Sequence, residues 1–577
     1  MRRSLGTVLL LFVLLGAGLL LDVGTARPAS AHASVVTSTP ADGARLDTAP
    51  DVVTLEFDEP VSLGAGYARV LDGDGERVDT GAAEVRGDVV TVPLEPDLPE
   101  AGYVVTYRVG SADSHPVSGA FSFVVGDGEL VPAGSVGTGD DGDPVVGTLL
   151  PLARWVGYAG LALGVGVPLA LATCWPGGWA SPRLRRAALG GLVAVAAGAG
   201  LLLLLQGPYA AAAGLGSVTD PDLLGATLGS GYGRTLLVRA GLALVLAAVL
   251  ARSWRRGRAP GPGVQVGAGA VAVALVVAVA AVGHPVAGSL PVLAVAVAAV
   301  HVAAMSGWLG GLTVLFAGLL RGTTPRAELD AALPRWSRLA GGFIGALVVS
   351  GVLQAVREVG SFSGLVSTTY GWVLVGKLAL VLLVLVAALV GRDWVHQRIG
   401  GGRRPGGSRR RVVAQAFAAG AAEEPPAQLG VFRRAVLVEL AGAVVVLVLS
   451  AVLVSQVPAQ ASMATPVDVT VPLRSAAGTE GTGSVQLTVD PARPGATTVH
   501  VYLLDAEDRL VQPRQIAVTL TELAQQIGPL DLDLAPAGPG HYVAEPSFPS
   551  AGSWTLTVNV RLDEFTAVTA STVFPVR

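Results

Sequence analysis

Seven histidines and one cysteine carry most of the metal-binding chemistry available to this chain of 577 residues. Two of the histidines, His32 and His115, lie within the first 126 residues. His115 stands two positions after Asp113, and in a turn two residues separated by one can point the same way. Cys174 is the single cysteine, so one chain can form neither a disulfide nor a thiolate cluster. A metal site would therefore use imidazole, carboxylate, thioether or backbone ligands.

The N-terminus has the pattern of a secretory signal. Two arginines precede an apolar run over 5–21, and small residues occupy 29–31. Cleavage after Ala31 would define a signal peptide over 1–31 and leave His32 first. Cleavage after Ala33 would remove that histidine, and a third alternative is an uncleaved anchor, because the run is nearly long enough to span a bilayer.

An N-terminal histidine can chelate one metal through its free amine and its ring Nδ1, a combination that suits tetragonal Cu(II). A second imidazole from His115 and a carboxylate from Asp113 would complete such a site with His32. In the alternative interpretation, Asp113 caps the turn and His115 is an ordinary surface histidine.

The region 32–126 is predicted to be a small β-sandwich or barrel. Apolar residues alternate with polar ones over 53–57 and 103–109, and Asp-Gly-Asp-Gly at 72–75 is typical of a hairpin turn. A segment rich in Gly and Asp follows, which indicates a linker over 127–148.

The composition indicates a membrane protein, because 51% of the residues are hydrophobic and 14% are charged. Apolar stretches near the ~20 residues that a spanning helix needs divide the region 149–457. We predict eight spans, at 149–172, 186–206, 233–251, 264–283, 290–320, 336–356, 370–391 and 435–457.

Charge predicts the orientation of these spans. The loops 207–232, 284–289 and 357–369 contain Arg357 as their one basic residue, whereas the intervening loops are rich in arginine. The positive-inside rule therefore places the second set in the cytoplasm, including the long basic loop 392–434. A multi-pass protein of the plasma membrane results, with both terminal regions extracytoplasmic.

The region 458–577 again alternates, for example over 485–489, 499–503 and 554–560, as in an Ig-like β-sandwich. His500 and His541 lie in it. Either could bind a metal, but with no cysteine, no internal methionine beyond Met463 and no close histidine pair evident from the sequence, we interpret both as surface or core residues.

Polar residues inside spans are costly, so they often mark a pathway. His301 lies about eleven residues into its span, near mid-bilayer, and Met305 follows on the same helix face. His284, at the outer mouth, would be a natural receiving group. Alternatively, His301 hydrogen-bonds a neighbouring helix and Met305 only packs. Gly307 and Gly311 are expected to permit close helix contact.

Three segments of the first region resemble the CopC copper-binding proteins: STPADG at 38–43, LEFDEPV at 55–61 and DSHPVSG at 113–119. The resemblance implies a Cu(II) site made by the amine and imidazole of His32, Asp113 and His115. The family's separate Cu(I) site is rich in methionine. This region has no methionine after the initiator, so we expect that site to be absent.

The membrane region resembles CopD through HVAAMSGWLGGL at 301–312, RWSR at 335–338, YG at 370–371 with Lys377, and RRAVLVE at 433–439. The layout is that of fused CopC–CopD proteins of the YcnJ-like type. The C-terminal region resembles YtkA-like or FixH-like β-domains through PSAGSWTLTV at 549–558 and GHY at 540–542.

The resemblance implies capture of Cu(II) outside the cell and copper transfer or import across the membrane, in copper homeostasis or resistance. The expected partners are copper ions, the bilayer and other extracytoplasmic copper proteins, with no nucleic acid and no enzyme activity. One alternative is an anchored chaperone, assembly factor or sensor without transport. A histidine-brace oxidase or monooxygenase is the other, which a region with few aromatics and a D-x-H motif disfavours.

Overall fold

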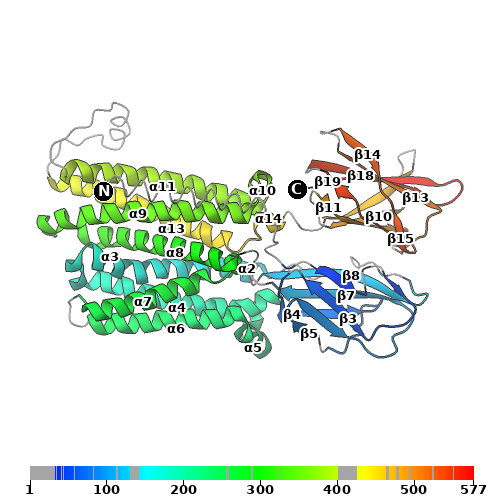
Figure 1. The fold of residues 1–577 in the computed structure, drawn as a ribbon, viewed down its shortest axis with the longest axis horizontal. Coiled ribbons are helices and arrows are strands. Elements are labelled where there is room, and N and C mark those ends of the chain that lie inside the picture. Colours follow the sequence, from blue (N-terminus) through cyan, green and yellow to red (C-terminus); the bar gives the residue numbers. More distant parts are fainter. Residues whose placement is uncertain are drawn as a thin grey trace.

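The protein consists of two β-regions at the same end of one helical bundle (Figure 1). His32, Asp113 and the predicted signal peptide lie outside the residues that the computed structural model describes. The described residues are 33, 35–40, 42, 44–57, 59–81, 83–111, 115–129, 131, 142–254, 259–287, 290–321, 324–399, 425–462, 467–475, 480–490, 492, 495–507, 509–522, 526–549 and 552–576.

The first β-region is a sandwich of two four-stranded sheets, with strand orders β1-β3-β6-β5 and β2-β8-β7-β4. Val53, Leu55 and Phe57 point into its core, as the alternation predicts. The strands are β1 (Val35–Thr39), β2 (Arg45–Leu46), β3 (Val52–Phe57), β4 (Ser62–Leu71), β5 (Glu84–Arg86), β6 (Val89–Pro93), β7 (Gly102–Gly110) and β8 (Pro116–Val125).

Strand β7 is buried on both faces, which its alternating pattern does not predict. Tyr103 and Val105 face the core of the sandwich, but Val104 and Arg108 on the opposite face are equally buried. The rest of the protein covers that second face, since Arg108 contacts the helical bundle. The first β-region is therefore docked onto the rest of the chain.

The C-terminal β-region has one continuous nine-stranded sheet, of order β14-β13-β18-β19-β9-β10-β12-β16-β15, where two separate sheets were expected. Two residue pairs alone join β19 to β9, and both halves of the sheet contribute to one core. The strands are β9 (Val467–Ser475), β10 (Glu480–Asp490), β11 (Gly495–Ala496), β12 (Thr498–Leu504), β13 (Gln515–Glu522), β14 (Ile527–Asp531), β15 (Ala535–Gly538), β16 (His541–Ala544), β17 (Ser547–Phe548), β18 (Gly552–Arg561) and β19 (Ala567–Val576).

The described residues include eight helices long and apolar enough to cross a membrane, which confirms the eight predicted stretches. The first combines α2 (Pro144–Leu161), π-helix η2 (Ala162–Gly166) and α3 (Val167–Thr173), and the fifth combines α8 (Pro291–Val314) with π-helix η6 (Leu315–Leu319). The others are α4 (Pro182–Ala210), α6 (Gly231–Trp254), α7 (Pro262–Ala280), α9 (Arg326–Val359), α11 (Thr369–Ile399) and α13 (Pro425–Leu453). Short helices are η3 (Pro176–Ala180), η4 (Leu215–Ser217), α5 (Pro221–Gly229), η5 (His284–Val286), α10 (Phe362–Ser367) and α14 (Ala459–Ser462).

Several helix ends differ from the predicted spans. Helix α2 starts inside the predicted linker, because the Asp143 carboxylate accepts hydrogen bonds from the Val145 and Val146 amides and Pro144 fits the first turn. Helices α11 and α13 both extend into the predicted basic loop, of which 400–424 lie outside the described residues.

Glycines on α8 allow its neighbours to approach closely. A Cβ on Gly307 would meet the Phe343 ring of α9 at 2.5 Å, and one on Gly311 would overlap the Trp336 ring. This confirms the contact role expected for both. A Cβ on Gly310 would overlap the backbone of Gly166 in η2, so α8 also fixes the first span.

Gly310→Ala is expected to destabilise the bundle, because the added methyl group meets backbone that cannot move aside. Overpacking of this kind costs about 1–3 kcal/mol. The readout is the temperature at which full-length protein in detergent leaves the monomer peak in gel filtration. Gly342→Ala on α9 is the matched control, since its methyl group would meet nothing within 4 Å. Equal midpoints for the two variants would contradict the close α8–η2 contact.

Candidate metal centre

His115 lies at the start of β8 and faces the helical bundle. The Ser111 amide and hydroxyl both donate to the His115 carbonyl, at 3.0 and 3.2 Å, which closes the turn from β7. The Nδ1 atom of His115 lies 3.3 Å from the hydroxyl oxygen of Tyr209, near the end of α4. His115 is only 4% exposed, so the interpretation as an ordinary surface histidine is wrong.

Arg108 holds this part of β7 against α4. Its Nε donates to the Ala210 carbonyl at 2.6 Å and its Nη2 to the Tyr209 carbonyl at 3.4 Å. A third donor, Nη1, reaches Ser118 Oγ on β8 at 3.0 Å. Because the last carbonyls of a helix lack partners within it, the guanidinium supplies donors where α4 needs them.

His284 lies directly against His115. It begins the short helix η5, between α7 and α8, and is 5% exposed. The two ring centroids are 5.4 Å apart with an interplanar angle of 29°. Two histidines that are 169 positions apart, 284 minus 115, therefore meet where the first β-region joins the bundle.

Glu358 provides a carboxylate beside this histidine pair. Its Oε2 lies 3.5 Å from His284 Nδ1, and the residue is buried in the last turn of α9. The neighbouring Arg357 donates to the Ala287 carbonyl and so fixes the loop that carries His284. The Tyr370 ring, at the start of α11, is 6.5 Å from the His284 ring.

Sequence reasoning missed Glu358 and Tyr209. A signal existed for Glu358, because a carboxylate at the end of an apolar stretch is costly and needs a partner. We considered only the charge of Arg357 in that loop. No sequence pattern identifies Tyr209, since its contact with His115 depends on how the β-region docks.

A line of polar side chains runs along α9 from Glu358. Gln354 and Ser350 follow at intervals of four residues, so the three share one helix face. Gln354 Nε2 donates to the Ser350 carbonyl at 3.2 Å, and Ser350 Oγ lies 2.9 Å from His301 Nδ1 on α8. Polar side chains on one face of α9 therefore occur at intervals from Glu358 to the residue that contacts the predicted mid-membrane histidine.

Met305 follows His301 on α8 and packs in an apolar cluster with Ala162, Tyr158 and Trp308. The hydrogen bond of His301 to α9 and this packing are the contacts expected if both residues have structural roles. A role for either in metal passage is therefore a proposal, based on the polar line along α9.

Among the described residues, no group of three or more His, Cys, Asp or Glu is arranged to hold a metal ion. Two of the three predicted ligands, His32 and Asp113, lie outside those residues. Close to the site, burial, and to a lesser extent the Asp490 carboxylate, raises the pKa of Tyr107 well above its ordinary value. Tyr107 therefore stays a neutral phenol.

The other histidines were placed less accurately from the sequence. His500 and His541 form a close pair, with 3.1 Å between His500 Nδ1 and His541 Nε2. The interpretation that no close pair exists in this region is therefore wrong. Their positions on paired strands explain the miss, because sequence separation conceals contacts across a sheet.

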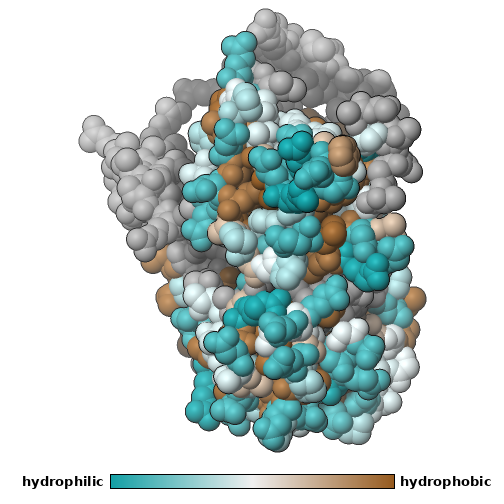
Figure 2. Space-filling view, turned by 90° about the vertical axis from the view of Figure 1, so that its right-hand side faces the viewer, coloured by the Kyte–Doolittle hydropathy of each residue, from teal (hydrophilic) through white to brown (hydrophobic). Residues whose placement is uncertain are grey.

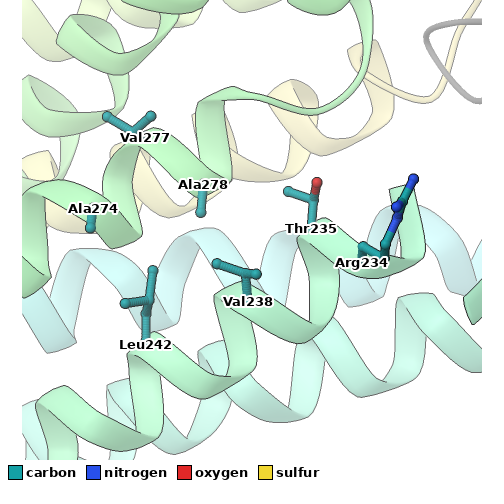
Figure 3. A pocket seen from close by; sticks show the side chains of 7 residues that line it. All are labelled: Arg234, Thr235, Val238, Leu242, Ala274, Val277 and Ala278. Atoms are coloured by element: carbon teal, nitrogen blue, oxygen red, sulfur yellow. The ribbon is translucent and has the colours of Figure 1, made fainter. Parts of the chain in front are cut away.

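A shallow groove between α6 and α7 has a different character (Figure 3). Its lining is apolar apart from Thr235 and Arg234 at one end, and Val238 and Val277 are well exposed. Such a surface suits lipid chains and offers no metal ligands.

Three family models match successive parts of the chain. The CopC domain matches residues 35–126, the N-terminal domain of copper resistance protein D-like proteins matches 144–291, and copper resistance protein D matches 330–453. The chain belongs to the CopC–CopD fusions. The resemblance of the C-terminal region to YtkA-like or FixH-like domains remains a prediction.

Individual relatives and one solved structure are similar to parts of this chain. Copper transport protein CutJ of Bacillus subtilis is 28% identical over 373 residues, which cover 62% of this chain and 67% of CutJ. Protein YobA of Escherichia coli is 33% identical over 98 residues, 16% of this chain and 79% of YobA. The crystal structure of CopC from Methylosinus trichosporium OB3b is 30% identical, with a TM-score of 0.16, and covers 16% of this chain and 93% of that one.

Arg108→Ala is expected to loosen the docking of the first β-region in this CopC–CopD fusion, because three hydrogen bonds to α4 and β8 are lost. Hydrogen–deuterium exchange of the full-length protein should become faster in β7, β8 and the end of α4. Arg86→Ala is the matched control, since Arg86 is exposed and pairs with the exposed Glu84. Unchanged exchange at the end of α4 would show that docking does not depend on Arg108.

Proposed function

We propose that this CopC–CopD fusion binds Cu(II) at His32, Asp113 and His115 and passes it directly to His284 and Glu358 of the membrane region. The contact between the His115 and His284 rings carries the proposal. The contact supports the proposal because the predicted capture ligand lies beside the predicted receiving group.

The ligand types support copper as the ion. An amine, two imidazoles and a carboxylate suit Cu(II), and the matching family models and CutJ are named for copper resistance and copper transport. The first β-region has no methionine or cysteine beyond the initiator, so it lacks the soft ligands that favour Cu(I).

Glu358 makes the receiving side attractive to a cation. Its carboxylate lies in the last turn of α9, where the helix dipole is negative, and it is buried. A buried negative charge at that position is unfavourable on its own. An incoming metal ion would offset this cost, together with the His284 imidazole 3.5 Å away.

Below the receiving groups, copper would follow the polar line Glu358, Gln354 and Ser350 to His301 and then Met305. His301 is ten residues into α8 from Pro291, roughly 15 Å along the helix axis. These side chains offer oxygen, nitrogen and sulfur atoms at successive depths. Among the described residues they form the polar connection from His284 toward the middle of the bundle.

We infer the orientation from charge and from the arrangement of the parts. The positive-inside rule assigns the helix ends that carry arginines, among them the start of α4 and the end of α6, to the cytoplasm. Both β-regions lie at the opposite end, and most of the described surface there is hydrophilic (Figures 1 and 2). We therefore place both β-regions outside the cell.

The two alternatives fit the geometry less well. A chaperone or sensor that serves other proteins needs an accessible copper ligand, whereas His115 is buried against Tyr209 and His284. A histidine-brace oxidase needs an open face for its substrate, and the bundle covers that side of the site.

Capture is tested with full-length protein whose mature N-terminus is His32. We expect His115→Ala to lose one tightly bound Cu(II) with a nitrogen-rich tetragonal EPR signal. His396→Ala, at the far end of α11, is the matched control and should retain it. Equal copper content in the two variants would rule out His115 as a ligand.

Transfer is tested by copper movement across proteoliposomes. We expect Glu358→Gln and His284→Ala to retain the captured Cu(II) but to move copper at least tenfold more slowly than the unmodified protein. This corresponds to an activation free energy of transfer raised by about 1.4 kcal/mol or more. Asp222→Asn, which removes an exposed carboxylate from α5, should have no effect. If the unmodified protein binds copper and moves none, the anchored alternative replaces the proposal.

A further inference from the structure

One face of the C-terminal sheet presents three aromatic side chains toward the first β-region. His500 and Tyr502 alternate on β12 with Val499 and Val501, which enter the core. Tyr502 is paired across the sheet with His541 on β16. The three rings therefore lie on the face opposite the core.

The rings form a tight stack. The His541 and Tyr502 centroids are 4.2 Å apart with an interplanar angle of 10°. His500 Nδ1 approaches His541 Nε2 to 3.1 Å. His541 is completely buried, while the side chain of His500 is 14% exposed, which leaves one route to solvent.

The first β-region supplies a carboxylate to this stack. Asp42 Oδ2 lies 3.7 Å from His500 Nδ1, and Asp42 Oδ1 accepts a hydrogen bond of 3.1 Å from the Ser122 amide on β8. Val124, on the same strand, packs against Tyr502. One β-region thus supplies the carboxylate, and the other supplies the two imidazoles.

This geometry is suited to a metal ion. Two nitrogens bound to one ion at ~2.0 Å, with an angle of about 90–109°, lie roughly 2.9–3.3 Å apart, and the observed 3.1 Å falls in that range.

As a purely structural element the pair is costly. His541 Nδ1 is buried and has no hydrogen-bond partner among the described residues. An unsatisfied buried nitrogen costs about 1–3 kcal/mol, and an apolar pair of similar size would avoid that cost. A role beyond packing explains why two imidazoles meet here.

We propose that His500 Nδ1, His541 Nε2 and the Asp42 carboxylate bind a second Cu(II) ion at the junction of the two β-regions. One of the two facing nitrogens carries the proton of their hydrogen bond. When the ion binds, that nitrogen releases its proton to solvent and the same ring takes up a proton at its other nitrogen, so both rings stay neutral and both facing nitrogens donate an electron pair to the ion. The described residues contain no ready three-ligand group, so Asp42 moves toward the ion when it enters. Bound copper then joins the two β-regions.

The two copper sites are separate. His115 stands just before β8, and Ser122, which holds Asp42, is seven residues further along that strand. At ~3.3 Å per residue the distance is roughly 23 Å. Loss of one site therefore leaves the other intact, and this inference does not depend on copper transfer into the bundle.

The experiment measures copper content and copper–copper distance in full-length protein with a mature His32. With Cu(II) as the probe, we expect two bound equivalents and a dipolar coupling between two separate Cu(II) ions by pulsed EPR. His500→Gln and Asp42→Asn should each retain one equivalent and lose the dipolar signal. His115→Ala should retain the other equivalent, and His396→Gln should retain both.

His500→Gln is the main variant because His500 is partly exposed, whereas His541→Gln alters a fully buried side chain. Gel filtration checks that each variant is folded. Two equivalents in His500→Gln and Asp42→Asn would overturn the second site. If the unmodified protein binds one equivalent and His500→Gln binds none, the site at His500 exists and the site at His115 does not. If the unmodified protein binds one equivalent and only His115→Ala loses it, the site at His115 exists and the site at His500 does not.

Discussion

The contact of Arg108 with the end of α4 is the interaction on which the arrangement depends. The carbonyls of Tyr209 and Ala210 lie at the helix C-terminus, where intrahelical partners run out and the dipole favours a cation. A buried guanidinium satisfies both and also holds Ser118 of β8. Because an unpaired Arg108 in the interior would carry a large cost, these contacts favour the observed docked position of the β-region. His115 meets His284 as a result.

Much of the fold can be predicted from the sequence, since hydrophobic periodicity determines it. Val53, Leu55 and Phe57 mark a half-buried strand, and the eight apolar stretches correspond to eight helices. The continuous C-terminal sheet was less predictable, because two residue pairs between β19 and β9 decide whether the halves are joined. Alternation reports which face of a strand is buried and says nothing about its neighbours in the sheet.

The residues of the candidate site could be predicted in part from the sequence, but the contacts between them could not. His115 and His284 could be selected because histidine is rare in this chain and ionisable groups near spans are costly. Their contact could not be predicted, and neither could Tyr209 or the pairing of His500 with His541. Each contact depends on docking between elements distant in sequence, so no local pattern of residues encodes it.

Strand β8 connects both junctions. Its beginning carries His115 toward the bundle, and its other half holds Asp42 and packs Val124 against Tyr502 of the C-terminal region. The first β-region is therefore held at two points and does not swing on a linker. Under the proposed function, a copper ion bound by His115 would lie beside His284, and its delivery would require an exchange of ligands over a few ångströms. The rate of transfer would then depend on how strongly each side binds the ion and would not depend on a domain motion.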